Sequence, residues 1–69
     1  MEPSLDARQM AALLARIQGE YREMPGLSLT ASQAERLWRL DPRTCAFVLG
    51  LLSERRVLRR ATNGSYLRD

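Results

Sequence analysis

Arginine is the residue type in this chain best suited to binding chemistry. All 11 basic residues are arginine, and eight residues are acidic. Residues 1–29 carry three arginines and four acids, whereas residues 30–69 carry eight arginines and four acids. Arginine presents a planar set of donors that suits phosphate groups, so the second part of the chain predicts an anionic partner. A genome rich in G and C, which favours arginine codons, is the alternative that composition leaves open.

Residues for catalysis or metal binding are sparse. The chain has no histidine and a single cysteine, Cys45, so we expect neither an intramolecular disulfide nor a zinc site. It also lacks a glycine-rich phosphate loop and paired carboxylates at a defined spacing, so we expect no enzyme and no cofactor. Cys45 shares an apolar stripe with Val48, Leu49 and Leu52. This pattern favours a buried core thiol over an exposed redox sensor.

Residues 29–58 predict a helix-turn-helix that runs into the first strand of a wing and contains five of the eight arginines of the second part of the chain. Thr30 and Gln33 have the spacing of a capping box at a helix N-terminus. Pro42 disfavours helical geometry in the residue before it and suits the first position of a new helix, with Asp41 as N-cap. Two helices with so short a connection must cross steeply, as in a helix-turn-helix.

The segment before this motif predicts the longest helix of the chain. Apolar residues recur at helical spacing from Met10 to Met24, and either Ser4 or Asp6 can cap this helix. Residues 1–4 are expected to be a frayed start. Residues 27–29 alternate apolar and polar side chains, and they could form a short third strand beside a C-terminal hairpin.

The segment after the motif predicts a β-hairpin. Asn63-Gly64 lies between β-prone runs and is typical of a two-residue type I′ turn, in which both residues have positive φ. On that register Arg60 faces Leu67, and Leu58 and Leu67 share the core face. Arg60 falls on the same face of the hairpin as Leu58 and Leu67, the face expected to pack on the core. Its side chain would therefore have to lie near the tip of the hairpin, or a bulge would have to turn it away from the core.

Together these patterns predict one α+β domain, mainly α, over residues 1–69, with an ordered core at about 5–68. The expected helices lie near 5–23, 30–39 and 42–55, and the expected strands near 57–62 and 65–68. The residues expected to be buried together are Leu13, Leu14, Ile17, Ala34, Leu37, Val48, Leu49, Leu52, Leu58 and Leu67. No apolar run approaches the roughly 18 residues of a membrane span, and no signal peptide is visible, so we expect a cytoplasmic protein without a membrane partner.

The order of these elements resembles that of winged helix-turn-helix domains. The resemblance rests on L-T-x-x-x-A-x-x-L-x-x-L-D, on T-C-x-x-V-L-x-x-L, and on V-L-R-R before a turn closed by Gly64 and Tyr66. With M-P-G-L-S-L-T before the motif, the chain particularly resembles small stand-alone bacterial winged-helix proteins, over roughly residues 5–68. It departs from them at Arg56, where glycine is frequent, and at Trp38, where a small residue is frequent. Such folds serve both DNA and protein partners.

One functional hypothesis is DNA binding, as in a transcriptional regulator. The resemblance implies that the second motif helix enters the major groove with its N-terminal end. Arg43 is the one credible base reader there, since arginine pairs bidentately with guanine, and Thr44 lies beside it. The residues expected to contact phosphates are Arg36, Arg39, Arg55, Arg59 and Arg60.

The alternative hypothesis is a protein-interaction or homodimerisation module. Beyond Arg43 and Thr44, the outward face of the second motif helix consists of Ala46, Phe47, Gly50, Leu51 and Ser53. These side chains offer few hydrogen-bonding groups to base edges, and exposed large apolar side chains usually bind other apolar surfaces. On this hypothesis the interaction residues are Trp38, Phe47 and Leu51.

Overall fold

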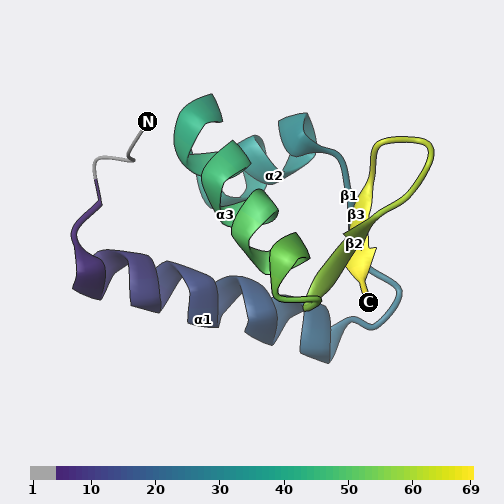
Figure 1. Ribbon diagram of the computed structural model, residues 1–69, viewed down its shortest axis with the longest axis horizontal. Helices are drawn as coiled ribbons and strands as arrows, with labels where there is room; N and C mark the ends of the chain where they lie inside the picture. The colour runs from purple at the N-terminus through teal and green to yellow at the C-terminus, as the bar shows by residue number, and fades with distance from the viewer. Residues whose placement is uncertain (1–4) are drawn as a thin grey trace.

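The computed structural model describes residues 5–69, which form three helices and a three-stranded antiparallel sheet (Figure 1). In chain order the elements are α1 (Ala7–Glu23), β1 (Ser28–Leu29), α2 (Ala31–Trp38), α3 (Pro42–Glu54), β2 (Leu58–Arg60) and β3 (Tyr66–Arg68). Figure 1 shows α1 along the bottom of the domain, α2 and α3 above it, and the sheet at one end. This arrangement confirms the predicted winged helix-turn-helix fold, including the short third strand. The expected frayed start and Ser4, the alternative cap, lie outside the described residues.

Local capping interactions explain where the helices begin. Asp6 and Gln9 form a capping box at the start of α1, and Thr30 and Gln33 form a second one at the start of α2. Asp41 caps α3, whose first residue is a proline. Each cap satisfies backbone N–H groups that a helix cannot satisfy internally. The predicted starts of α2 and α3 are confirmed to within one residue. The first helix, predicted to begin near residue 5, begins at Ala7, and Asp6, one of its two predicted caps, is its N-cap.

Two arginines end helices in the left-handed backbone conformation. Arg39, after α2, has a φ of 53°, and Arg56, after α3, has a φ of 59°. Beyond Arg56, the Val57 N–H donates to the Leu52 carbonyl oxygen at 2.9 Å, which closes the end of α3. Glycine adopts this conformation without steric cost. This explains why the winged-helix proteins that the chain resembles often have glycine at the position of Arg56.

The core lies between the three helices and the inner face of the sheet. Its buried side chains are Ile17, Tyr21, Ala34, Trp38, Cys45, Val48, Leu49, Leu52 and Leu58. Six of these were in the predicted set of residues buried together, and Cys45 was predicted separately as a core thiol. Leu13 and Leu14 are partly buried against them. Among residues 5–69, no helix is long and apolar enough to cross a membrane.

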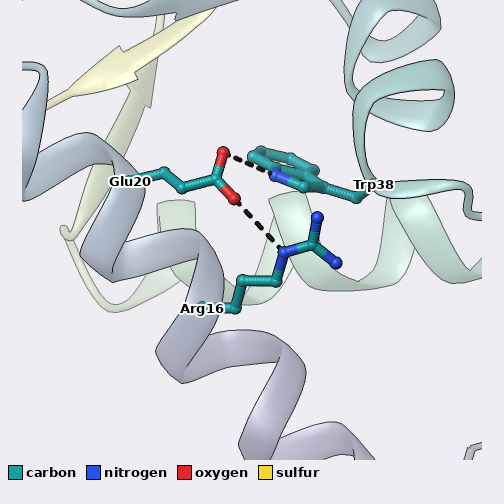
Figure 2. Close-up of polar contacts among 3 residues, drawn as sticks. All are labelled: Arg16, Glu20 and Trp38. Atoms are coloured by element: carbon teal, nitrogen blue, oxygen red, sulfur yellow. Dashed lines mark hydrogen bonds and ion pairs between the residues drawn. The ribbon is translucent and has the colours of Figure 1, made fainter.

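The predicted core was wrong at the end of α2. Leu37 is 46% exposed, whereas Trp38 is only 3% exposed. Trp38 packs against Tyr21, with ring centroids 6.4 Å apart, and its indole N–H donates to Glu20 Oε1 at 3.0 Å. Figure 2 shows that Glu20 also pairs with Arg16, at 3.3 Å. The contact with α1 therefore places Trp38 rather than Leu37 against the core.

The predicted register of the hairpin was wrong by one residue. The strands are ordered β1-β3-β2, and Arg60 pairs with Tyr66 rather than with Leu67. Leu58 and Tyr66 therefore share the face that packs on the core, and Leu67 lies on the other face and is only partly buried. Leu29 pairs with Tyr66 from the other side of β3.

The shift in register comes from the turn. Ala61 N–H donates to the Ser65 carbonyl oxygen at 2.8 Å, and Gly64 N–H donates to the Ala61 carbonyl oxygen at 2.9 Å. Three residues, 62–64, therefore connect the strands, and only Gly64 has a positive φ, of 88°. This is the pattern of a type I turn followed by a left-handed glycine, so the expected type I′ turn is corrected.

Candidate nucleic-acid interface

The predicted phosphate-contacting arginines are all exposed, but they form two groups. Arg36 and Arg39 lie with the base-reader candidate Arg43 around the connection between α2 and α3. Arg55, Arg59 and Arg60 lie at the far end of α3 and in β2. Arg43 and Arg55 are about 18 Å apart along α3, given about 1.5 Å of rise per residue. The fold therefore separates the two groups by the length of α3.

Thr44 is placed where it cannot read a base. Its side chain is buried, and its hydroxyl donates to Asp41 Oδ1 at 2.6 Å. The Thr44 backbone N–H donates to the other carboxylate oxygen at 3.1 Å. Both hydrogen bonds lower the pKa of Asp41 below its usual value, and the bond from the Thr44 hydroxyl has the larger effect. Thr44 therefore serves the cap of α3 and is removed from the candidate interface.

Three arginines line a groove between the C-terminal end of α3 and β2. Its lining residues are Ser53, Glu54, Arg56, Leu58, Arg59, Arg60 and Asp69. Arg59 and Arg60 were predicted as phosphate contacts, whereas Arg56 was not. The sequence did mark Arg56 as unusual, because the winged-helix proteins that the chain resembles often have glycine at this position.

A second cleft lies on the other side of Arg56. Its lining residues are Gln18, Tyr21, Arg22, Arg56, Val57, Arg68 and Asp69. Arg22 comes from the end of α1 and Arg68 from β3, so residues far apart in the sequence meet here. Neither was predicted as a contact, because neither lies in the helix-turn-helix motif or in the strand that directly follows it.

The arginines of the first groove carry charge that the fold does not neutralise. Within residues 5–69, the single ion pair with a nitrogen–oxygen distance of 4.0 Å or less joins Arg16 and Glu20. Glu54 and Asp69 line the groove without pairing at that distance with Arg56, Arg59 or Arg60. Exposed and unpaired guanidinium groups are suited to an anionic ligand.

The outer face of α3 is mostly apolar. Phe47 is 42% exposed, Ala46 and Gly50 are exposed, and Leu51 is half-buried. These four residues and Glu54 line a shallow groove. The hydroxyl of Ser53, also predicted on this face, donates to the Leu49 carbonyl oxygen at 2.8 Å. Arg43 is therefore left as the single donor-rich side chain of this face, and Trp38 is corrected from a candidate interaction residue to a core residue.

Cys45 is a core thiol, as the sequence indicated. It is 1% exposed, and its Sγ donates to the Ala31 carbonyl oxygen at 3.6 Å. Burial, with smaller effects from Glu35 and Asp41, raises the pKa of Cys45 to about 11. The reactive thiolate is therefore disfavoured near neutral pH. In the part of the chain that the structure describes, no three carboxylate, thiol or imidazole side chains form a potential metal site.

The three helices and the small antiparallel sheet form an α+β domain with a winged-helix-like arrangement. No protein-family model, no curated protein and no solved structure matches this chain. The resemblance to small bacterial winged-helix proteins stays a prediction, and the function has to be inferred from the surface of the domain.

Proposed function

We propose that this domain binds duplex DNA by contacting its phosphate backbone with the arginines at the end of α3 and in β2. The observation that supports this most is the groove that Arg56, Arg59 and Arg60 line without an ion pair to a carboxylate. Arg55, exposed at the C-terminal cap of α3, extends the same basic surface. Guanidinium groups form bidentate, charge-assisted hydrogen bonds with phosphate oxygens.

The proposed binding depends little on base sequence. Phosphate contacts fix the position of a protein on the duplex, whereas contacts with base edges provide specificity. Thr44 is buried, and the face of α3 around Phe47 lacks donors and acceptors for base edges. Only Arg43 could add a base contact. A role in transcription regulation, in the cytoplasm, would then follow from placement on DNA more than from recognition of one operator.

Salt dependence tests this proposal without knowledge of a target. With about four phosphate contacts, the slope of log affinity against log salt concentration should be about −3 to −4. Titrations with one GC-rich and one AT-rich duplex should give similar slopes and similar affinities. No detectable binding to either duplex at about 50 mM salt would contradict the proposal, because the electrostatic contribution is large at that concentration.

Single substitutions identify the contacts. Arg59→Ala and Arg60→Ala should each flatten the slope by about one unit, because each lost phosphate contact reduces counterion release. Arg8→Ala is the matched control. Arg8 is exposed in the first turn of α1, so this substitution removes the same charge far from the groove. Equal effects of all three substitutions would show that net charge, rather than the groove, determines binding.

Phosphate binding does not account for the exposed apolar face of α3. Phe47 and the neighbouring Ala46, Gly50 and Leu51 offer no side-chain donor to a phosphate. These residues favour the second functional candidate, association with another protein chain, and this is compatible with DNA binding at the wing.

A further inference from the structure

We propose that the outer face of α3 binds a second copy of this chain, with the two α3 helices antiparallel about a two-fold axis that passes between Val48 and Leu49. The proposal does not depend on DNA binding, and of the residues that line this face only Glu54 also lines the arginine groove. In Figure 1, α3 lies in front of α2, and no other element of the chain lies in front of it. The groove on α3 is lined by residues from that helix alone.

The exposed residues of α3 form a contact line. Arg43, Phe47, Gly50 and Glu54 are all exposed, and they follow one another at intervals of four, three and four residues. This is the spacing with which helices of a coiled coil contact each other. The buried residues of α3, from Thr44 to Leu52, lie on the opposite side of the helix.

The pattern along this line is complementary to itself when one copy is reversed. Phe47 and Gly50 are equally distant from the proposed axis, so each Phe47 ring faces Gly50 of the partner subunit. A large side chain therefore meets a small one twice in the interface. A two-fold interface requires such self-complementarity.

The charges at the ends of the line show the same symmetry. Arg43 and Glu54 are also equally distant from the axis, so each Arg43 faces Glu54 of the partner subunit. Neither residue forms an ion pair within the described chain. Arg43 lies in the first turn of α3 and Glu54 is its last residue, and each charge is disfavoured by the dipole of its own helix end. In the antiparallel pair each lies beside the opposite, favourable end of the partner helix.

Gly50 provides an independent argument. A glycine inside a helix is destabilising relative to alanine, and a Cβ at Gly50 would meet no atom within 4 Å. The single chain therefore contains no steric reason for glycine at this position. Close approach of the Phe47 ring of the partner subunit supplies one, because that ring needs the space that a side chain would fill.

These features favour a second copy over an unrelated partner. An unrelated protein could bind Phe47, but it would not require small residues and opposite charges at symmetric positions of α3. An anionic ligand is disfavoured by the apolar lining, since Ala46, Phe47, Gly50 and Leu51 carry no side-chain donor. A single helix pair is smaller than a standard interface of about 800 Å² per partner, so we expect reversible dimers at micromolar concentrations.

Charge reversal tests the antiparallel geometry. In sedimentation velocity without DNA, the chain should approach twice its 7.9 kDa as concentration rises. Arg43→Glu and Glu54→Arg should each weaken association by about tenfold, because like charges then face each other twice per dimer. The double variant Arg43→Glu, Glu54→Arg should recover the original association. A monomer at all concentrations, or a double variant no better than the singles, would overturn the proposal.

Substitution of the glycines tests the packing. Gly50→Ala and the matched control Gly19→Ala, in α1, should both raise the melting temperature of the monomer by roughly 4 °C, since each glycine lies inside a helix with open space beside it. Only Gly50→Ala should weaken association, and Phe47→Glu should abolish it. Equal association of the two glycine variants would contradict close packing at Gly50. Failure here would leave the salt-dependent DNA binding unaffected, because Gly50 and Phe47 lie outside the arginine groove.

Discussion

The indole N–H of Trp38 donates a hydrogen bond to Glu20 Oε1 at 3.0 Å, and this contact joins α2 to α1. The Trp38 side chain is 3% exposed, so its polar nitrogen has little access to water. A buried polar group without a partner is costly, whereas a paired one is not. The second oxygen of Glu20 is held by Arg16 (Figure 2). A tryptophan is therefore accommodated where winged helices often have a small residue.

Glu20→Ala should lower the free energy of unfolding by about 1–3 kcal/mol, because the indole N–H of Trp38 then loses its acceptor. Glu20→Gln retains an acceptor and should cost less. Glu23→Ala is the control, since Glu23 is exposed in the same helix, and its effect should be within about 0.5 kcal/mol. Urea unfolding followed by tryptophan fluorescence measures all three. Equal losses for Glu20→Ala and Glu23→Ala would show that the bond contributes nothing.

Leu49→Ala should destabilise the domain by about 2–5 kcal/mol, because it leaves a cavity at a fully buried position. So large a loss is comparable with the whole stability of a small domain. Leu37→Ala removes the same atoms from a side chain that is 46% exposed and should cost far less. Circular dichroism during urea unfolding distinguishes the two variants. Similar losses at both positions would contradict the packing of α2 described above.

Features decided by residues close together in the sequence were predicted well. The three helix starts depend on pairs such as Thr30 and Gln33, three positions apart. The starts of α2 and α3 were predicted to within one residue, and that of α1 to within two. Thr44 shows the limit of this reasoning. Its position near the start of α3 suggested contact with a base, but the carboxylate of Asp41 engages its hydroxyl instead.

Features decided by contacts between distant segments were predicted poorly. Trp38 is buried in place of Leu37 because Glu20, on another helix, accepts its N–H. Asn63-Gly64 fits both a two-residue turn and a three-residue loop, so the turn alone could not fix the register. In the observed register Tyr66 faces the core, and its carbonyl oxygen accepts a hydrogen bond from the Tyr21 hydroxyl at 2.8 Å. The periodicity of one segment carries no information about partners such as Glu20 and Tyr21, which lie on another helix.

The stability of the domain should fall above pH 9. Burial raises the pKa of Cys45 from 9.0 to about 11 and that of Tyr21 from 10.0 to about 12. Both groups stay protonated in the fold, so their contribution is fully present below pH 9 and is lost as pH rises through the raised values. Urea unfolding between about pH 8 and pH 12 measures this loss.

Two substitutions show how much of the loss of stability at alkaline pH comes from Cys45 and how much from Tyr21. Cys45→Ala should remove the part of the pH dependence that begins near 9, and Tyr21→Phe the part that begins near 10. Both variants should be less stable than the original chain at neutral pH, because each removes atoms from the core or a hydrogen bond. A free energy of unfolding in the original chain that stays constant to about pH 11 would contradict the burial of both groups.

Arg56 should carry opposite contributions to stability and to DNA binding. Its φ of 59° lies in the left-handed region, which costs a residue with a Cβ roughly 1–2 kcal/mol. Glycine avoids that cost but loses more backbone entropy on folding, roughly 0.5–1 kcal/mol. Arg56→Gly should therefore raise the free energy of unfolding by up to about 1 kcal/mol. Arg39→Gly, at the other left-handed position, should have a similar effect on stability.

The same Arg56→Gly substitution should weaken binding to duplex DNA and flatten the salt slope by about one unit, since a phosphate contact is lost. Arg56→Ala separates the backbone effect from the charge effect. It should show the same loss of binding without the gain in stability, because alanine keeps the steric conflict at positive φ. Thermal unfolding and salt-dependent duplex titration of both variants test the two effects together. If Arg56→Gly bound DNA as well as the original chain, the guanidinium of Arg56 would have no part in the interface, and the groove would have to act through Arg59 and Arg60 alone.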